Sequence, residues 1–269
     1  MTTNQSTLTG QGLPVGDLLA TLRLLQSDGM TPEDFKAIAQ NGKMRSDIMA
    51  AVFRHRLFTP PEEQIKKLLE INEAVWKDKA ITEAAIRGLG NPPECPISDE
   101  TGLYCVGLFY ETGDAVKTFQ NNWDACVHVF GKMGTWKWGG VIFTPKGVRQ
   151  RHGAKVRSKG LRWAVLELGR KFQRQSVEKV RPQLDADSIM GMGQELPLVA
   201  ALHPHWAKAM NGNDIPFVDA PDLDISPHAY GDFCRVPYLY FDAGSGEVYL
   251  SSSRVGNAHL RYGSGWFRQ

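Results

Sequence analysis

The chain has 269 residues, 42% of them hydrophobic, which excludes a disordered or fibrous protein and allows one large domain or two to three small ones. Its 31 basic and 29 acidic side chains leave a net charge of +2, which argues against a protein that coats a polyanion along its whole length. Seven tryptophans, seven tyrosines and twelve phenylalanines favour a well-packed interior that contains sheet.

Residues 1–12 are polar and uncharged, which predicts a disordered tail and not a signal peptide. No run of eighteen apolar residues occurs, so we expect no membrane span. The cysteines lie at wide, irregular spacings that match no zinc motif, so we expect reduced thiols and a cytoplasmic protein. They are Cys95, Cys105, Cys126 and Cys234.

Residues 13–94 are predicted to form a helical module. An apolar stripe covers residues 18–25, and Thr31 followed by Pro32 is typical of a helix start. Another helix is expected after Thr59. Residues 33–53 also allow a helix-turn-helix interpretation with Gly42 in the turn, but the polar neighbours of Gly42 favour a plain helical hairpin.

Residues 95–160 are predicted to form a small α/β unit with a basic loop, because a proline-rich linker at residues 91–96 precedes a change of pattern. We expect a buried strand at 103–110, a helix at 114–130 and a strand at 136–143.

Residues 161–269 are predicted to form a third domain, so the chain as a whole is expected to belong to the α+β class. The patterns indicate a strand at 161–168, helices at 176–183 and 195–210, and then short strands. These strands are expected at 215–219, 235–241, 247–251 and 258–267, with a hairpin turn at 242–246.

Two short motifs in this third domain carry a family resemblance. They resemble segments of formylglycine-generating-enzyme relatives. The first consists of Gly193, Leu196 and Pro197 ahead of Trp206, and the second of residues 263–268 (GSGWFR). With the strand at 161–169 in the first-strand position, the resemblance implies a C-type-lectin-like fold in which the first and last strands pair. The catalytic cysteine pair of that family is missing, since only Cys234 lies in the region, and the calcium-binding lectin triplets are missing too.

A wider resemblance covers about two-thirds of the chain. It is a similarity to uncharacterised proteins of uncultured small-genome bacteria, and it rests on residues 59–72, 136–138 and 161–169 together with the closing strands. This resemblance implies no particular activity.

The sequence therefore favours a non-catalytic recognition protein without a cofactor, because no catalytic motif is present and C-type-lectin-like scaffolds bind through surface loops. The expected loops are residues 222–232, 244–246 and 251–257, and the partner would be an unknown protein or small ligand. The candidate ligand-binding residues are Arg254, Asn257, His259, Tyr262 and Trp266.

A basic segment supports an alternative function. Residues 146–181 hold twelve lysines and arginines against Glu167 and Glu178, so this segment carries +10 and the rest of the chain −8. A flexible cationic loop of this kind suits phosphate contacts with nucleic acid. The other interpretation is a solvated loop that docks against the acidic remainder of the chain or against an acidic partner. The candidate phosphate-binding residues are Lys146, Arg149, Arg151, Lys155, Arg157 and Lys159.

A metal site is not expected. His203 and His205 are two positions apart, whereas histidines that share a metal on a helix lie four apart. We therefore expect ordinary hydrogen bonds for this pair.

Overall fold

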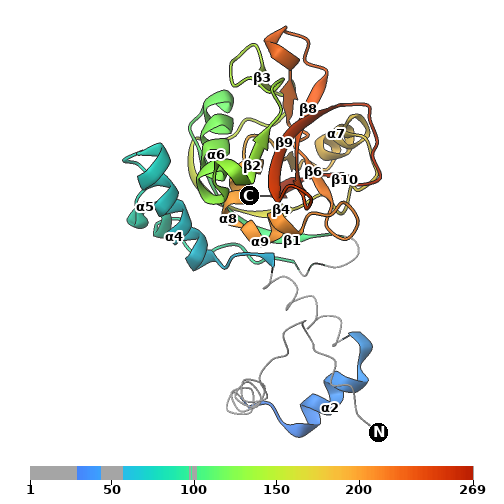
Figure 1. Ribbon diagram of the computed structural model, residues 1–269. Coiled ribbons are helices and arrows are strands. Elements are labelled where there is room, and N and C mark those ends of the chain that lie inside the picture. Colours follow the sequence, from blue (N-terminus) through green and yellow to red (C-terminus); the bar gives the residue numbers. More distant parts are fainter. Residues whose placement is uncertain (1–28, 44–56, 97, 99–101, 269) are drawn as a thin grey trace. The chain divides into compact units, whose positions relative to one another are not determined.

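The computed structural model describes residues 29–43, 57–96, 98 and 102–268 (Figure 1). The chain divides into two compact units, Met1–Met49 and Ala50–Gln269. In the first unit the described residues form helix α2 (Pro32–Gln40), whose predicted start is confirmed. The Thr31 hydroxyl accepts a hydrogen bond from the Asp34 N–H, and the Asp34 carboxylate accepts one from the Thr31 N–H. The apolar stripe at 18–25 and residues 44–53 of the helix-turn-helix segment lie outside the described residues.

The boundaries expected at 94/95 and 160/161 both fall inside the second unit. Strand β1 (Tyr104–Glu111) pairs antiparallel along its whole length with β4 (Gly160–Glu167), which joins the expected α/β unit to the expected third domain in one sheet. Helix α4 (Pro61–Ile71) packs against β1, and its buried side chains belong to the same hydrophobic cluster. Segments of this size do not bury their apolar faces alone, so they fold as one body.

Sheet A has four strands among the described residues, in the order β1, β4, β11 (Trp266–Arg268) and β5 (Met190–Gly191). The expected pairing of the first and last strands of the C-terminal third is confirmed. Strand β11 runs antiparallel to β4, with Phe267 opposite Leu166.

Sheet B has seven strands among the described residues, and the long hairpin β8 (Arg235–Asp242) and β9 (Glu247–Arg254) forms its centre. The predicted turn joins this hairpin, and Gly246 supplies its positive φ of 75°. One edge of β8 pairs with β6 and β7, and β9 pairs in parallel with β2. The remaining bounds are β2 (Thr135–Lys137), β3 (Val148–Gln150), β6 (Phe217–Asp219), β7 (Leu223–Ile225) and β10 (Tyr262–Ser264).

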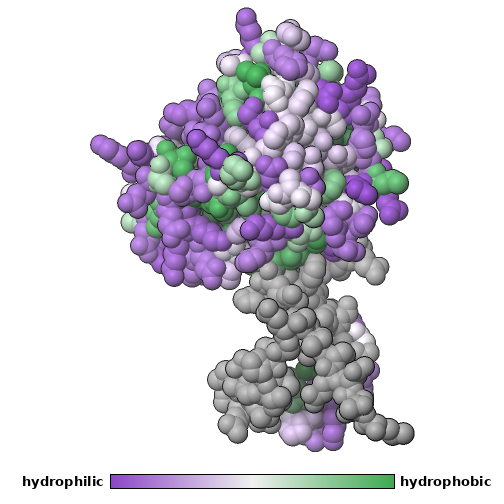
Figure 2. Space-filling view, in the orientation of Figure 1, coloured by the Kyte–Doolittle hydropathy of each residue, from purple (hydrophilic) through white to green (hydrophobic). Residues whose placement is uncertain are grey.

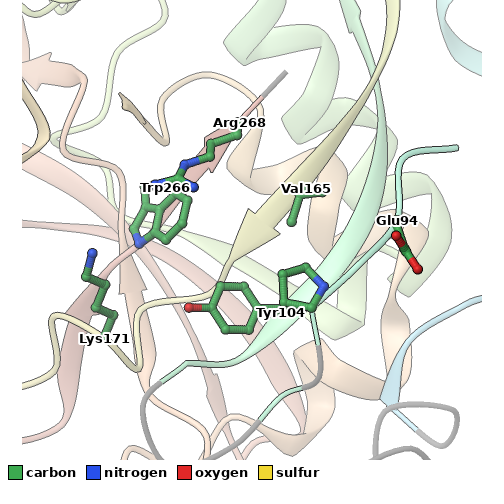
Figure 3. Close-up of a pocket in the computed structure, with 7 residues that line it drawn as sticks. Glu94, Tyr104, Val165, Lys171, Trp266 and Arg268 are labelled. Atoms are coloured by element: carbon green, nitrogen blue, oxygen red, sulfur yellow. The ribbon is translucent and has the colours of Figure 1, made fainter. Parts of the chain in front are cut away.

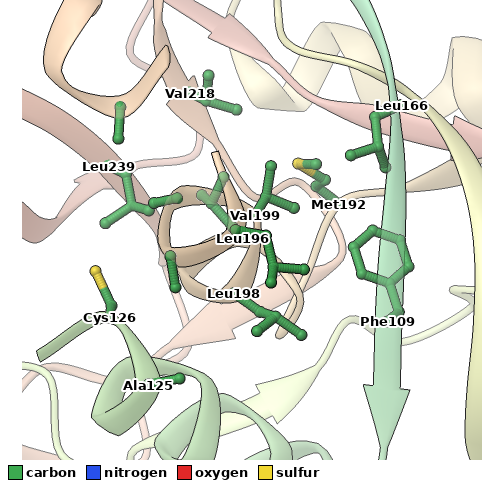
Figure 4. Packing of buried hydrophobic residues seen from close by; sticks show 14 of the residues in the cluster. Phe109, Ala125, Cys126, Leu166, Met192, Leu196, Leu198, Val199, Val218 and Leu239 are labelled. Carbon is green, nitrogen blue, oxygen red and sulfur yellow. The ribbon is translucent and has the colours of Figure 1, made fainter. Parts of the chain in front are cut away.

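Helix α8 (Leu196–Leu202) forms the centre of the core, because every one of its residues is buried. Figure 4 shows it with Phe109 and Leu166 of sheet A on one side, and with Leu239 of sheet B on another. Helix α6 (Ala115–Phe130) closes the core with Ala125 and Cys126; Asp114 caps it by accepting a hydrogen bond from the Lys117 N–H. In the second unit, helices and both sheets therefore contribute to one main hydrophobic core, and the chain is of the α+β class.

Three predicted elements differ from the structure. The strand expected at 258–267 divides into β10 and β11, which belong to different sheets. The helix expected at 195–210 divides into α8 and α9 (Pro204–Ala209), because Pro204 has no N–H to continue the ladder and starts a new helix after His203. The strand expected at 136–143 ends at Lys137, just before Gly139 and Gly140. The remaining helical elements are Asn72–Trp76, α5 (Glu83–Arg87), Lys132–Gly134, α7 (Val177–Ala186) and Pro227–Ala229.

Candidate functional site

An aromatic row crosses the outer face of sheet B. Trp136 of β2 lies opposite Tyr249 of β9, which lies opposite Tyr240 of β8. On the other edge of β8, the register of β6 brings Phe217 beside Tyr240, and Tyr262 of β10 lies opposite Phe217. Because paired residues on neighbouring strands point to the same face of a sheet, five strands contribute one ring each to this row.

The rings of the aromatic row touch one another along its length. Their centroids are 4.9 Å apart for Trp136 and Tyr249, 4.8 Å for Tyr249 and Tyr240, 5.3 Å for Tyr240 and Phe217, and 5.5 Å for Phe217 and Tyr262. Every separation falls within the range of favourable aromatic pairs. The row is therefore a continuous, preorganised surface.

The aromatic row is partly open to solvent. Trp136 is 41% exposed, and the other four rings are partly exposed, whereas Leu239 and Leu250 on the opposite face of the same hairpin are completely buried. Figure 2 shows the surface over β8 and β9 as a pale band of intermediate hydropathy between purple charged side chains. A contiguous exposed patch of large side chains marks an interaction surface more often than isolated exposed residues do.

Acidic and hydroxyl groups border the aromatic row at the β8–β9 turn. The Tyr249 hydroxyl donates to the Glu247 carboxylate at 2.9 Å and accepts a hydrogen bond from the Ser245 hydroxyl at 3.3 Å. Burial, and next the neighbouring Tyr238, raise the pKa of Tyr240 to about 12. Burial and a hydrogen bond with Tyr238 also raise the pKa of Tyr262. These hydroxyls therefore stay protonated near neutral pH and remain hydrogen-bond donors.

The predicted ligand-binding residues are divided between the two sheets. His259 is exposed and lies 4.6 Å from the Tyr262 ring, so both belong to the region of the aromatic row. Arg254 and Asn257 are exposed in the turn after β9, where the Asn257 N–H donates to the Arg254 carbonyl.

The expectation that Trp266 lies on the exposed surface is wrong, because its side chain is only 4% exposed. The chain passes from sheet B to sheet A between β10 and β11, and this turns the indole into a second, smaller hydrophobic cluster with Phe172 and Leu184.

Three arginines of the predicted phosphate-binding set are paired with carboxylates. Arg157 is buried, with its Nε 2.5 Å from Glu195. Arg151 lies 2.7 Å from Asp185, and Arg149 lies 3.4 Å from Asp224 and packs on an aromatic ring.

The rest of the basic segment is less constrained. Lys155 is exposed and donates to the Ser188 carbonyl, and Lys146 and Lys159 are exposed. The expectation of a flexible cationic loop is therefore wrong for much of this segment, because ion pairs hold its arginines to acidic residues of the chain.

These pairs belong to a buried ionic network that the sequence patterns did not reveal. Arg162 bridges Glu111 at 3.2 Å and Glu195 at 3.1 Å, and Arg157 joins Glu195 to Asp222. Burial and the adjacent Glu195 raise the pKa of Glu111 to about 8, while the two arginines lower the pKa of Glu195. Glu111 therefore keeps its proton near neutral pH. The network connects sheet A to α8 and to residues 151–159.

The two predicted histidines do not form a metal site. His203 is fully buried, and its Nδ1 accepts a hydrogen bond from the Thr59 N–H at 3.0 Å. Burial lowers the pKa of His203 to about 3, so the ring is neutral. Among the described residues, no group of three or more potential ligand side chains is arranged to hold a metal, and no helix is long and apolar enough to cross a bilayer.

Comparisons of the chain with protein-family models, with curated proteins and with solved structures find no match.

Proposed function

We propose that the protein is a non-catalytic recognition protein that binds a polypeptide partner through the aromatic row. The observation that carries this proposal is the unbroken contact of five partly exposed rings from five neighbouring strands. Tyrosine and tryptophan are enriched at protein interfaces because they offer a large amphipathic surface at a low entropic cost. Rings already packed against one another lose little further freedom on binding.

The ring geometry favours a peptide over a ligand that stacks flat on one ring. Tyr240 and Tyr249 are stacked at 28°, so each of these two rings covers a face of the other, and in this proposal the partner meets ring edges and hydroxyls. Edges and hydroxyls suit an extended backbone with its alternating donors and acceptors. The carboxylates of Asp242 and Glu247 beside the row favour a basic side chain in the partner.

The C-type-lectin-like fold remains part of this proposal. The antiparallel pairing of β4 with β11 and the helices α7, α8 and α9 between them in sequence support it. In this proposal, the binding surface is the outer face of sheet B with the turn after β9, and the protein acts in the cytoplasm.

A selection from a library of random linear peptides tests the proposal. Peptides enriched on the wild-type protein should bind Tyr240→Ala at least about tenfold more weakly, because a central interface tyrosine contributes roughly 1.4 kcal/mol or more. Tyr230→Ala is the matched control, since Tyr230 is 84% exposed and lies outside the aromatic row. Equal binding to both variants, or a selection that enriches no peptide, would contradict the proposal.

Nucleic-acid binding through residues 146–181 is the weaker proposal. The pairing of Arg151 and Arg157 with buried carboxylates reduces the positive charge that phosphates would meet. Retention on single- and double-stranded DNA at low salt, lost at moderate salt, would favour this alternative over the peptide.

A further inference from the structure

A cavity of about 420 Å³ lies on the outer face of sheet A, away from the aromatic row of sheet B. Its floor is made by Tyr104 of β1, Val165 of β4 and Trp266 of β11. Helix α4 contacts β1, and α5 contacts β4. Trp163 of β4 lines a separate pocket together with residues of α4 and α5. The cavity therefore occupies the part of this face where Tyr104 and Val165 remain partly exposed.

Two cations flank the indole of Trp266 at one side of the cavity (Figure 3). Lys171 Nζ lies 5.4 Å and Arg268 Cζ 5.3 Å from a ring centroid of Trp266. Within the described part of the chain, the carboxylate paired with Lys171 is the solvent-exposed Asp187 at 3.9 Å, and such a pair contributes little. Arg268 has no ion pair to any carboxylate within residues 29–43, 57–96, 98 and 102–268.

Buried groups hold Lys171 in this position. The Glu167 carboxylate, completely buried on β4, accepts hydrogen bonds from the backbone N–H groups of Leu103, Gly169 and Lys171 at 3.1, 3.2 and 3.1 Å. The loop that carries Lys171 is thus tied to the cavity floor. The backbone that carries the Lys171 side chain therefore needs no reordering when a ligand binds.

The same side of the cavity has an excess of hydrogen-bond donors. The Trp266 Nε1–H is buried and has no acceptor among the described residues, and Figure 3 shows this nitrogen on the side of the ring that faces Lys171. The acid in the lining, Glu94, lies at the opposite side of the cavity from Lys171. An ammonium, a guanidinium and an indole N–H on one wall call for an anionic acceptor.

We propose that this cavity binds a small organic carboxylate with a planar apolar body. The carboxylate binds beside the Trp266 indole, close to Lys171 and Arg268, where charge-assisted hydrogen bonds are strong, and the planar body lies on Tyr104 and Val165. The volume is within the usual range for small-molecule sites. This site is separate from the aromatic row, and either proposal can fail without the other.

Titration with 2-naphthoate, followed through the indole N–H resonances of the ¹⁵N-labelled protein, tests the site. The resonance that is missing in Trp266→Phe identifies Trp266. We expect 2-naphthoate to shift this resonance with a Kd of about 1 mM or below, and the neutral isostere 2-naphthamide to bind at least about tenfold more weakly.

Variants locate the anion. Lys171→Gln and Arg268→Gln should each weaken 2-naphthoate binding about tenfold and leave 2-naphthamide binding unchanged. Lys146→Gln, which removes an exposed lysine outside the cavity lining, and Tyr240→Ala, which alters the aromatic row, should have no effect. Equal binding of acid and amide, an unchanged Kd in both cavity variants, or no shift of Trp266 up to about 5 mM would overturn the proposal.

Discussion

Asp219 gives the sharpest test of the packing described for sheet B. It lies on β6, opposite Tyr238 and beside Ser264 of β10, and it is only 3% exposed. Its Oδ1 has no hydrogen-bond partner among the described residues, and burial raises the pKa of this carboxyl to about 8. Near neutral pH the folded protein therefore holds a proton that the unfolded chain releases at its ordinary pKa of about 3.9.

The sign and size of the effect follow from this difference. Between about pH 4 and pH 8 the folded state binds the extra proton, so the free energy of unfolding falls by about 1.4 kcal/mol for each pH unit. This stabilising contribution is complete below the unfolded pKa and is lost as the pH rises through the folded pKa. From about pH 5.5 to pH 7.5 the wild-type protein should lose about 3 kcal/mol through Asp219.

Asp219→Asn removes this loss, because an amide does not ionise. Denaturant unfolding at several pH values should show the stability of the variant rising relative to the wild type by about 3 kcal/mol over the two units. Burial also raises the pKa of Glu111 to about 8 and that of Glu167 to about 7, but both are present in each protein and cancel in the difference.

Asp214→Asn is the matched control, since it makes the same chemical change at an exposed position and should leave the pH profile unchanged. A stability difference between Asp219→Asn and wild type that stays constant from pH 5.5 to 7.5 would refute the burial of an uncompensated carboxyl on β6.

Substitutions at three further positions test the ionic network, a helix cap and a close backbone contact. Arg157→Met should cost about 3–5 kcal/mol of unfolding free energy in denaturant titrations, because it removes one buried cation from Glu195 and Asp222 and leaves Arg162 to neutralise Glu195 alone; a cost below about 1 kcal/mol would show the network to be dispensable. Asp114→Ala should lower the unfolding free energy by about 1 kcal/mol and Asp114→Ser should largely restore it, whereas equal losses would mean that the cap contributes nothing. Gly263→Ala should cost about 3 kcal/mol or more, seen as a fall in Tm, because a Cβ would overlap the Gly169 carbonyl oxygen; an unchanged Tm would contradict this backbone contact.

Local sequence signals predicted the elements that they encode directly. Thr31 and Asp114 are side-chain caps, and the helices α2 and α6 begin directly after them. The strand at 161–168 could be predicted because a short, mostly apolar run is consistent with a buried strand. Strand β4 spans Gly160–Glu167. Such features need only neighbours in the chain.

The domain boundaries and the basic segment depended on contacts between distant residues. A change of pattern near residue 95 marks a linker, but it does not show that β1 and β4 will pair. Likewise, a count of lysines and arginines measures charge and not pairing. The partners of Arg157 lie 38 and 65 positions further along the chain, at Glu195 and Asp222, and no spacing rule connects them.

The aromatic row was missed for the same reason. Its members come from five strands spread between Trp136 and Tyr262, and only the registers of sheet B align them. The sequence held one partial signal, the alternation of Tyr238 and Tyr240 on β8, which places two rings on one face. His259 and Tyr262 were predicted as binding residues and do lie at one end of the row.

Hydroxyl-radical footprinting of the protein, with and without a peptide selected on it, tests the aromatic row as the binding surface most directly. We predict that the peptide protects Trp136, Tyr240 and Tyr249 from oxidation and leaves the exposed Tyr230 as reactive as before. Protection of Tyr230 with no change at the three rings of the row would place the binding surface elsewhere and contradict the account.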